Sequence, residues 1–82
     1  MDLVGLTETI VKSLVVHKDS VSVKEFPTED ENTILIEVMV NEEDMGKIIG
    51  KDGRTANAVR TLVQASSSLT DDKYVKIDID SF

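Results

Sequence analysis

Residues 46–54 read GKIIGKDGR, and this stretch decides the fold. It holds three of the four glycines of the chain, which has 82 residues and a formal net charge of −7. Gly50 and Gly53 stand three positions apart, so the backbone can turn sharply twice and come close to another molecule. Four basic residues against one acid give residues 46–60 a net charge of +3: Lys47, Lys51, Arg54 and Arg60 against Asp52. The segment is a small basic island in an acidic molecule.

The glycines join two helical patterns. Asn41 followed by Asp44 resembles a capping box and predicts a helix start. Met45, Ile48 and Ile49 give this short helix an apolar face, and Gly50 ends it. A second helix is expected from Arg54, with one apolar side made of Ala56, Val59, Leu62 and Val63. The glycine-rich turn therefore lies between two helices, not between a strand and a helix.

The flanking segments complete the domain. A helix is expected over residues 2–18, with Asp2 as the N-cap and with Lys12, His17 and Lys18 near its C-terminal end. Alternation predicts strands over residues 20–26, 33–40 and 74–80, with a six-residue hairpin loop at 27–32 between the first two. On the 33–40 strand, one face holds Ile34, Ile36, Val38 and Val40. The order helix, strand, strand, helix, tight turn, helix, strand predicts a two-layer α+β fold in one domain, residues 1–82.

Composition excludes several classes of protein. The chain has no cysteine, so disulfides and thiolate metal sites are ruled out. Its apolar runs are far shorter than the roughly 20 residues that span a bilayer, and its N-terminus lacks a basic signal-peptide region, so we expect a cytoplasmic protein with no membrane contact. The lone His17 and the solvated carboxylate runs form no catalytic or metal-ligating pattern. We expect no enzyme activity, no cofactor and no metal.

Two phosphate-binding motifs can be rejected, and a third kind of site remains. A Walker loop needs four residues between its glycines, but only three separate Gly46 from Gly50, and Asp52 stands where a hydroxyl is required. The dinucleotide fingerprint G-x-G-x-x-G is absent. The amides of Lys51 and Asp52, together with the start of the helix at Arg54, can instead donate to the phosphates of an extended backbone.

The stretch DMGKIIGKDGRTANAVR, residues 44–60, resembles the signature of the KH domain. In that family a G-x-x-G loop, here residues 50–53, clamps about four nucleotides of single-stranded nucleic acid. The element order resembles the type II arrangement α-β-β-α-α-β, which implies a three-stranded mixed sheet with three helices on one face. Size and acidity resemble the small stand-alone bacterial KhpA-type RNA-binding proteins.

This resemblance implies a set of RNA-binding residues: Lys47, Ile48, Ile49, Gly50, Lys51, Asp52, Gly53, Arg54 and Arg60. One of Ile48 and Ile49 should line the groove and the other should enter the core, and the sequence leaves open which. Residues 35–40 are expected to wall the groove. The aromatic residues Phe26, Tyr74 and Phe82 are expected to lie away from it. The function implied is that of a single-stranded RNA-binding protein, an RNA chaperone or post-transcriptional regulator.

The resemblance also implies partners. It predicts a homodimer, a heterodimer with a larger KH-containing RNA-binding protein, or both. Candidate contact residues are Leu35 and Met39 on the outer strand face and Val11 and Val15 beside the first helix, although ordinary surface apolarity explains them equally well. The alternative function is a KH-fold protein–protein interaction module with little RNA affinity of its own.

Overall fold

A computed structural model describes residues 2–70 and 72–82. These residues form three helices and three strands: α1 (Leu3–Leu14), β1 (Ser22–Pro27), β2 (Thr33–Val40), α2 (Met45–Ile49), α3 (Arg54–Thr70) and β3 (Tyr74–Ser81). Short 3₁₀ turns lie at Lys18–Ser20, Glu42–Asp44 and Lys51–Gly53. The predicted order α-β-β-α-α-β is confirmed.

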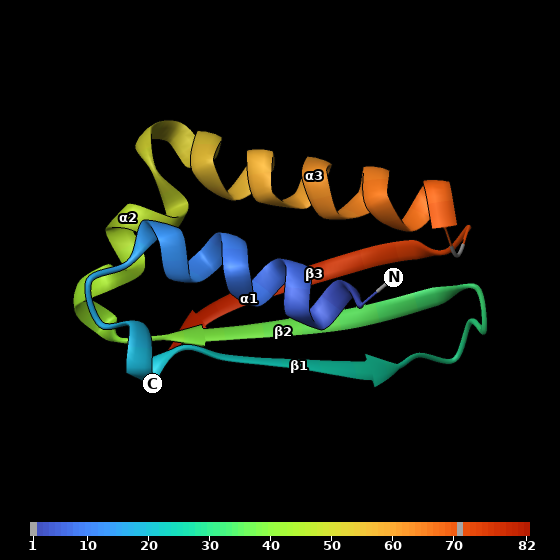
Figure 1. The fold of residues 1–82 in the computed structure, drawn as a ribbon, viewed down its shortest axis with the longest axis horizontal. Coiled ribbons are helices and arrows are strands. Elements are labelled where there is room, and N and C mark those ends of the chain that lie inside the picture. The colour runs from blue at the N-terminus through green and yellow to red at the C-terminus, as the bar shows by residue number, and fades with distance from the viewer. Residues whose placement is uncertain (1, 71) are drawn as a thin grey trace.

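The sheet is mixed, with β2 in the centre. β1 runs antiparallel to β2, with Val23 opposite Val38, and β3 runs parallel to β2, with Ile36 opposite Ile77. Figure 1 shows the helices layered on one face of this sheet. The predicted two-layer α+β architecture is therefore confirmed.

The core lies between the two layers. Alternate β2 side chains are buried beneath the helices, as the sequence predicts: Ile34, Ile36, Val38 and Val40. They pack in one cluster with residues of α1 and α3 such as Val11 and Val63, both fully buried. Burial of each such side chain contributes about 1.5–3 kcal/mol, which holds the helices that carry the glycine turn against the sheet.

The first helix is shorter than predicted. Asp2 does cap it, because its Oδ1 accepts a hydrogen bond from the Gly5 N–H at 2.9 Å. The helix ends at Leu14, however, and Val15 is extended, so His17 and Lys18 lie beyond the last turn. The prediction of a helix to residue 18 was wrong because a buried acid from another part of the chain holds the amides that would have continued it.

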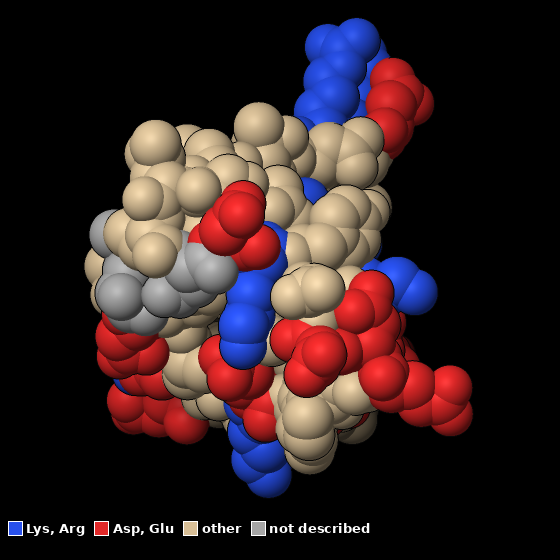
Figure 2. All heavy atoms as spheres, turned by 90° about the vertical axis from the view of Figure 1, so that its right-hand side faces the viewer, with Lys and Arg blue, Asp and Glu red and all other residues tan. Residues whose placement is uncertain are grey.

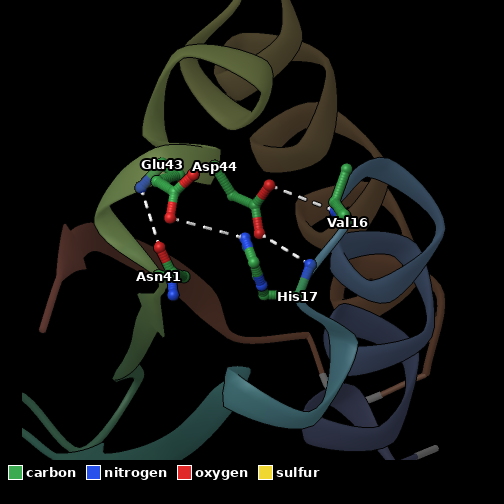
Figure 3. A network of polar contacts seen from close by, with 5 residues as sticks. All are labelled: Val16, His17, Asn41, Glu43 and Asp44. Carbon is green, nitrogen blue, oxygen red and sulfur yellow. Dashed lines mark hydrogen bonds and ion pairs between the residues drawn. The ribbon is translucent and has the colours of Figure 1, made fainter.

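That acid is Asp44, shown in Figure 3, and it is fully buried. Its Oδ1 accepts from the Val16 N–H at 3.1 Å, and its Oδ2 accepts from the His17 N–H at 2.9 Å. The expected capping box was therefore wrong. Asn41 does cap the next turn, by accepting from the Glu43 N–H at 2.9 Å, but Asp44 points away to the segment after α1.

The hairpin also differs in detail. β1 includes Pro27, which pairs with Ile34, so the loop covers residues 28–32 and not 27–32. A proline fits there because β1 is an edge strand, where a missing amide donor breaks no ladder bond.

The hydrogen bonds from the Val16 and His17 amides help to keep Asp44 ionised. Burial alone would raise the pKa of this carboxyl, but the amides of His17 and Val16 and the charges of His17 and Lys47 lower it. The net pKa lies below its ordinary value of 3.8. Asp44 is thus an ionised carboxylate that ties the α1–β1 connection to the start of α2.

Because the folded-state pKa is lowered, the carboxylate stabilises the fold above pH 3.8, and this contribution disappears as the pH falls through the folded-state pKa. We expect Asp44→Asn to melt on the order of 5 °C below wild type at neutral pH, because it leaves a backbone amide without an acceptor. This gap should narrow on acidification, as wild type loses the same charge. Thermal melts followed by circular dichroism, at neutral pH and below pH 3.8, measure this difference in melting temperature. Glu42→Gln is the control and should melt like wild type, because Glu42 is exposed and belongs to neither ion pair found among the described residues. A gap that stays constant with pH would contradict this role.

Candidate nucleic-acid interface

The glycine turn adopts a backbone that explains both glycines. Gly50 ends α2 by donating its N–H to the Gly46 carbonyl at 2.9 Å, with φ 73° and ψ 177°. Gly53 has φ 76°, and Asp52 between them is also left-handed at φ 56°. Three of four consecutive residues thus lie in backbone regions that side chains with a Cβ adopt rarely.

The two glycines differ in their surroundings. A Cβ built on Gly50 would overlap the hydroxyl of Thr55 and come within 2.7 Å of the Thr55 Cβ. A Cβ on Gly53 would meet no atom within 4 Å. Gly50 is therefore required by packing as well as by conformation, whereas the space beside Gly53 is open.

The structure separates the two isoleucines that the sequence left undecided. Ile48 is fully buried in the core, and Ile49 is half-buried beside the glycine turn. Of this pair, only Ile49 has surface available for a ligand. Lys47, one turn of helix before Lys51, is exposed.

The strand that lies next to α3 is β3, not β2. β2, which contains residues 35–40, is the central strand, and both of its edges are paired. The outer edge of β3 faces α3: Gln64 accepts from the Val75 N–H at 2.8 Å, and Arg60 Nε lies 3.4 Å from the Ile77 carbonyl oxygen. Residues 35–40, which were expected to wall the groove, thus lie one strand away from α3, and β3 is the strand beside it.

A hollow of about 460 Å³ lies between α3 and the edge of β3. Its lining residues are Arg60, Thr61, Gln64, Ala65, Tyr74 and Val75. Tyr74, one of the three aromatic residues expected away from the groove, lines this hollow beside α3. No local sequence signal could show this, because Arg60 and Tyr74 come together only when β3 lies alongside α3.

The basic residues of the site lack acidic partners nearby. Within residues 2–70 and 72–82, the ion pairs closer than 4 Å are Lys12 with Glu8 and His17 with Glu43. The four cations of the basic island, Lys47, Lys51, Arg54 and Arg60, take part in neither pair, and all four are exposed. Figure 2 shows the end of the molecule that carries residues 28–32, where acidic side chains cover much of the lower half. Positive charge is thus free at the glycine turn, while acids crowd elsewhere.

Helix α3 also presents apolar residues to solvent. Leu62 was expected in the core, but it is 55% exposed, and the buried face of α3 continues instead through Val63 and Ser67. Exposed residues recur along the outer side of the helix at Ala58, Leu62, Ala65 and Leu69. Val11 and Val15, expected as contact residues, are buried and unavailable.

The described residues contain no group of three or more histidine or acidic side chains placed to hold a metal ion. Among the described helices, none is long and apolar enough to cross a bilayer.

An α-β-β-α-α-β chain with a mixed sheet, and with a G-x-x-G turn between its second and third helices, has the type II KH fold. Comparison with known families makes the assignment specific. The chain belongs to the KhpA/KhpB KH-domain family, whose model matches residues 5–79.

Individual relatives agree with this assignment. The chain is 47% identical over 74 residues to the RNA-binding protein KhpA of Caldanaerobacter subterraneus subsp. tengcongensis, a match covering 90% of this chain and 95% of that protein. It is 39% identical over 74 residues to the RNA-binding protein KhpA of Thermotoga maritima, covering 90% and 93% respectively.

Solved structures show the same fold at lower identity. Aquifex aeolicus Era bound to GDP and aluminium fluoride superposes with a TM-score of 0.71 at 19% identity, over 98% of this chain and 30% of Era. Era in complex with MgGDPNP and nucleotides 1506–1542 of 16S ribosomal RNA gives a TM-score of 0.68 over 96% of this chain and 29% of Era. This chain thus corresponds to under a third of Era.

The two glycines should respond differently to alanine. Gly50→Ala places a Cβ against Thr55 in a backbone region open almost only to glycine, so we expect a loss of about 3 kcal/mol in the free energy of unfolding. Gly53→Ala suffers left-handed strain alone, so we expect a loss of about 1–2 kcal/mol. Urea unfolding measures both, and equal losses would mean that Thr55 does not fix Gly50.

Proposed function

We propose that this chain is a cytoplasmic single-stranded RNA-binding protein, an RNA chaperone or post-transcriptional regulator, in which residues 1–82 act as one KH domain. The main support for this proposal is the turn at residues 50–53, which contains two glycines with positive φ. The cations around this turn have no acidic partner within 4 Å among the described residues. Relatives named as RNA-binding proteins support the proposal.

The loop holds the backbone of about four nucleotides. Lys47, Lys51 and Arg54 supply positive charge, and the backbone amides of Lys51 and Asp52 add donors beside the positive end of the α3 dipole. Asp52 contributes its backbone amide, while its exposed carboxylate lowers the affinity. RNA binding by one domain is therefore weak, and it weakens further with salt.

The bases face the remainder of the groove. Ile49 offers an apolar surface beside the turn, and Arg60 lies at the outer edge of β3, with its Nε 3.4 Å from the Ile77 carbonyl oxygen. A groove of this kind takes unstacked bases, so single strands bind in preference to duplexes.

A second copy raises the apparent affinity by linking two weak sites. The apolar residues Ala58, Leu62, Ala65 and Leu69 recur at spacings of four, three and four, which is the seam of a helix pair. The two alanines allow close approach, and an antiparallel arrangement brings Arg54 of one copy toward Asp72 of the other. Ala58, Leu62 and Leu69 do not line the hollow beside Arg60 and Gln64, whereas Ala65 does, so the dimer meets one rim of the groove.

Lys51→Asp tests the loop. It places two adjacent carboxylates where phosphates bind, each repelling a phosphate by about 1 kcal/mol at 4 Å even in a water-like dielectric. We expect no measurable shift of a labelled single-stranded RNA, with a circular dichroism spectrum like that of wild type. Lys24→Asp on β1 makes the same change in net charge away from the site and should bind nearly as wild type does.

If Lys51→Asp binds as well as wild type, the clamp is not at residues 50–53. If wild type itself binds no RNA at low or moderate salt, the alternative of a KH-fold protein–protein interaction module is favoured.

Leu62→Glu tests the dimer. Burying a carboxylate in each half of an apolar seam should weaken self-association tenfold or more. Size-exclusion chromatography with light scattering at tens of micromolar measures the mass. Leu35→Glu, on the outer face of the sheet, is the matched control and should remain dimeric. Dissociation by Leu35→Glu alone would place the interface on the sheet, and a monomeric wild type would leave a larger KH-containing protein as the partner.

A further inference from the structure

Tyr74 stands at the start of β3 with its side chain 61% exposed. It is the only tyrosine in a chain that has no tryptophan. Tyr74 alternates along β3 with the buried Val75 and Ile77, so its ring points away from the core, and β3 is an edge strand of the sheet. An exposed ring of this size offers a flat apolar face to a ligand.

Three surface hollows meet at this ring. One of about 390 Å³ includes Leu35, Arg60 and Lys76, and the one of about 460 Å³ described above includes Arg60 and Gln64. A third of about 440 Å³ continues past Lys76 toward residues 28–30. The ring is thus open to solvent from the α3 side and from the sheet side.

Two cations, Arg60 and Lys76, line the same hollow as the ring and form no ion pair among the described residues. Arg60 makes only long contacts, 3.4 Å from Nε to the Ile77 carbonyl and 3.4 Å from Nη1 to Asn57 Oδ1. Neither Arg60 nor Lys76 has an acidic partner within 4 Å among the described residues. Both can turn toward a phosphate at little cost.

Acids also border the hollows and limit this attraction. Asp78 lines the first hollow, and Glu29 and Asp30 line the third. The carboxylate of Asp30 is already engaged with the Asn32 N–H and the Thr33 hydroxyl. With cations and acids nearly balanced, the ring face rather than net charge must supply the binding energy.

The backbone beside the ring does not suit an added peptide strand. Gln64 occupies both the Val75 N–H and the Lys73 carbonyl, at 2.8 and 3.0 Å, and Ser67 donates to the same carbonyl at 2.8 Å. These are the groups that a new strand would pair with. A planar ligand that stacks on the ring and carries a phosphate fits better.

We propose that Tyr74 is a base-stacking subsite for an unpaired nucleobase of single-stranded RNA, with Arg60 and Lys76 beside the adjoining phosphates. This inference rests on the proposed function and extends it. Gln64, which touches β3 beside the ring, lies about 15 Å along α3 from Arg54, so a strand held at residues 50–53 reaches the ring by following the helix. The loop then binds the RNA backbone, and the Tyr74 ring stacks on a base.

Because Tyr74 is the sole tyrosine, its fluorescence reports directly on the subsite. An eight-nucleotide single-stranded RNA should quench the emission in parallel with binding followed by anisotropy, after correction for RNA absorption with free N-acetyltyrosinamide. A strand of abasic sites with the same length should bind more weakly through its phosphates and leave the emission unchanged.

Substitution supplies the second measurement. Tyr74→Leu should lower the affinity for the RNA about fivefold or more, and Tyr74→Phe should retain it, because stacking depends on the ring. Phe82→Leu removes an exposed ring beyond the opposite end of β3 and should bind as wild type does.

RNA binding with unchanged tyrosine emission, and with Tyr74→Leu equal to wild type, would overturn the subsite while leaving the 50–53 clamp intact. Absence of RNA binding by wild type would overturn the proposed function and the subsite together.

Discussion

Because β3 runs parallel to β2, with Ile36 opposite Ile77, the chain must travel back along the sheet between the two strands. That return path contains α2, the glycine turn and α3, and these elements lie in the helical layer (Figure 1). The same pairing sets β3 at the sheet edge beside α3, where Arg60 and Gln64 reach its backbone. The candidate groove is a consequence of this one parallel pair.

The buried carboxylate of Asp44 supports the same region from the other side. Asp44 accepts hydrogen bonds from two backbone amides just beyond the end of α1, and it lies directly before α2 in the chain. A short helix of five residues has little stability of its own, so its position depends on such tertiary contacts. The geometry of the 50–53 turn thus depends on a residue that touches no ligand.

An acidic chain that binds a polyanion must do so at short range. At physiological salt, charges farther apart than about 8 Å are largely screened, so the net charge of −7 weighs less than the cations at the turn. The arrangement favours modest affinity that additional contacts can raise. The proposed second copy along α3 and the proposed base on Tyr74 of β3 are two such contacts.

The sequence by itself determined the order of elements, the alternation that buries Ile34 through Val40, the Asp2 cap, and the glycine turn between two helices. Each of these follows from residues a few positions apart, whose local periodicity and backbone preference are readable in one dimension. Only the tertiary structure decided that Ile48 enters the core while Ile49 stays at the surface, that Leu62 faces outward, and that Asp44 bonds to Val16 and His17 rather than capping its own turn. It also decided that β3, which begins with Tyr74, lies beside α3 while β2 is the central strand. These outcomes depend on which segments pack together across the fold, because a side chain's burial and hydrogen-bond partners are set by distant residues that no local pattern specifies.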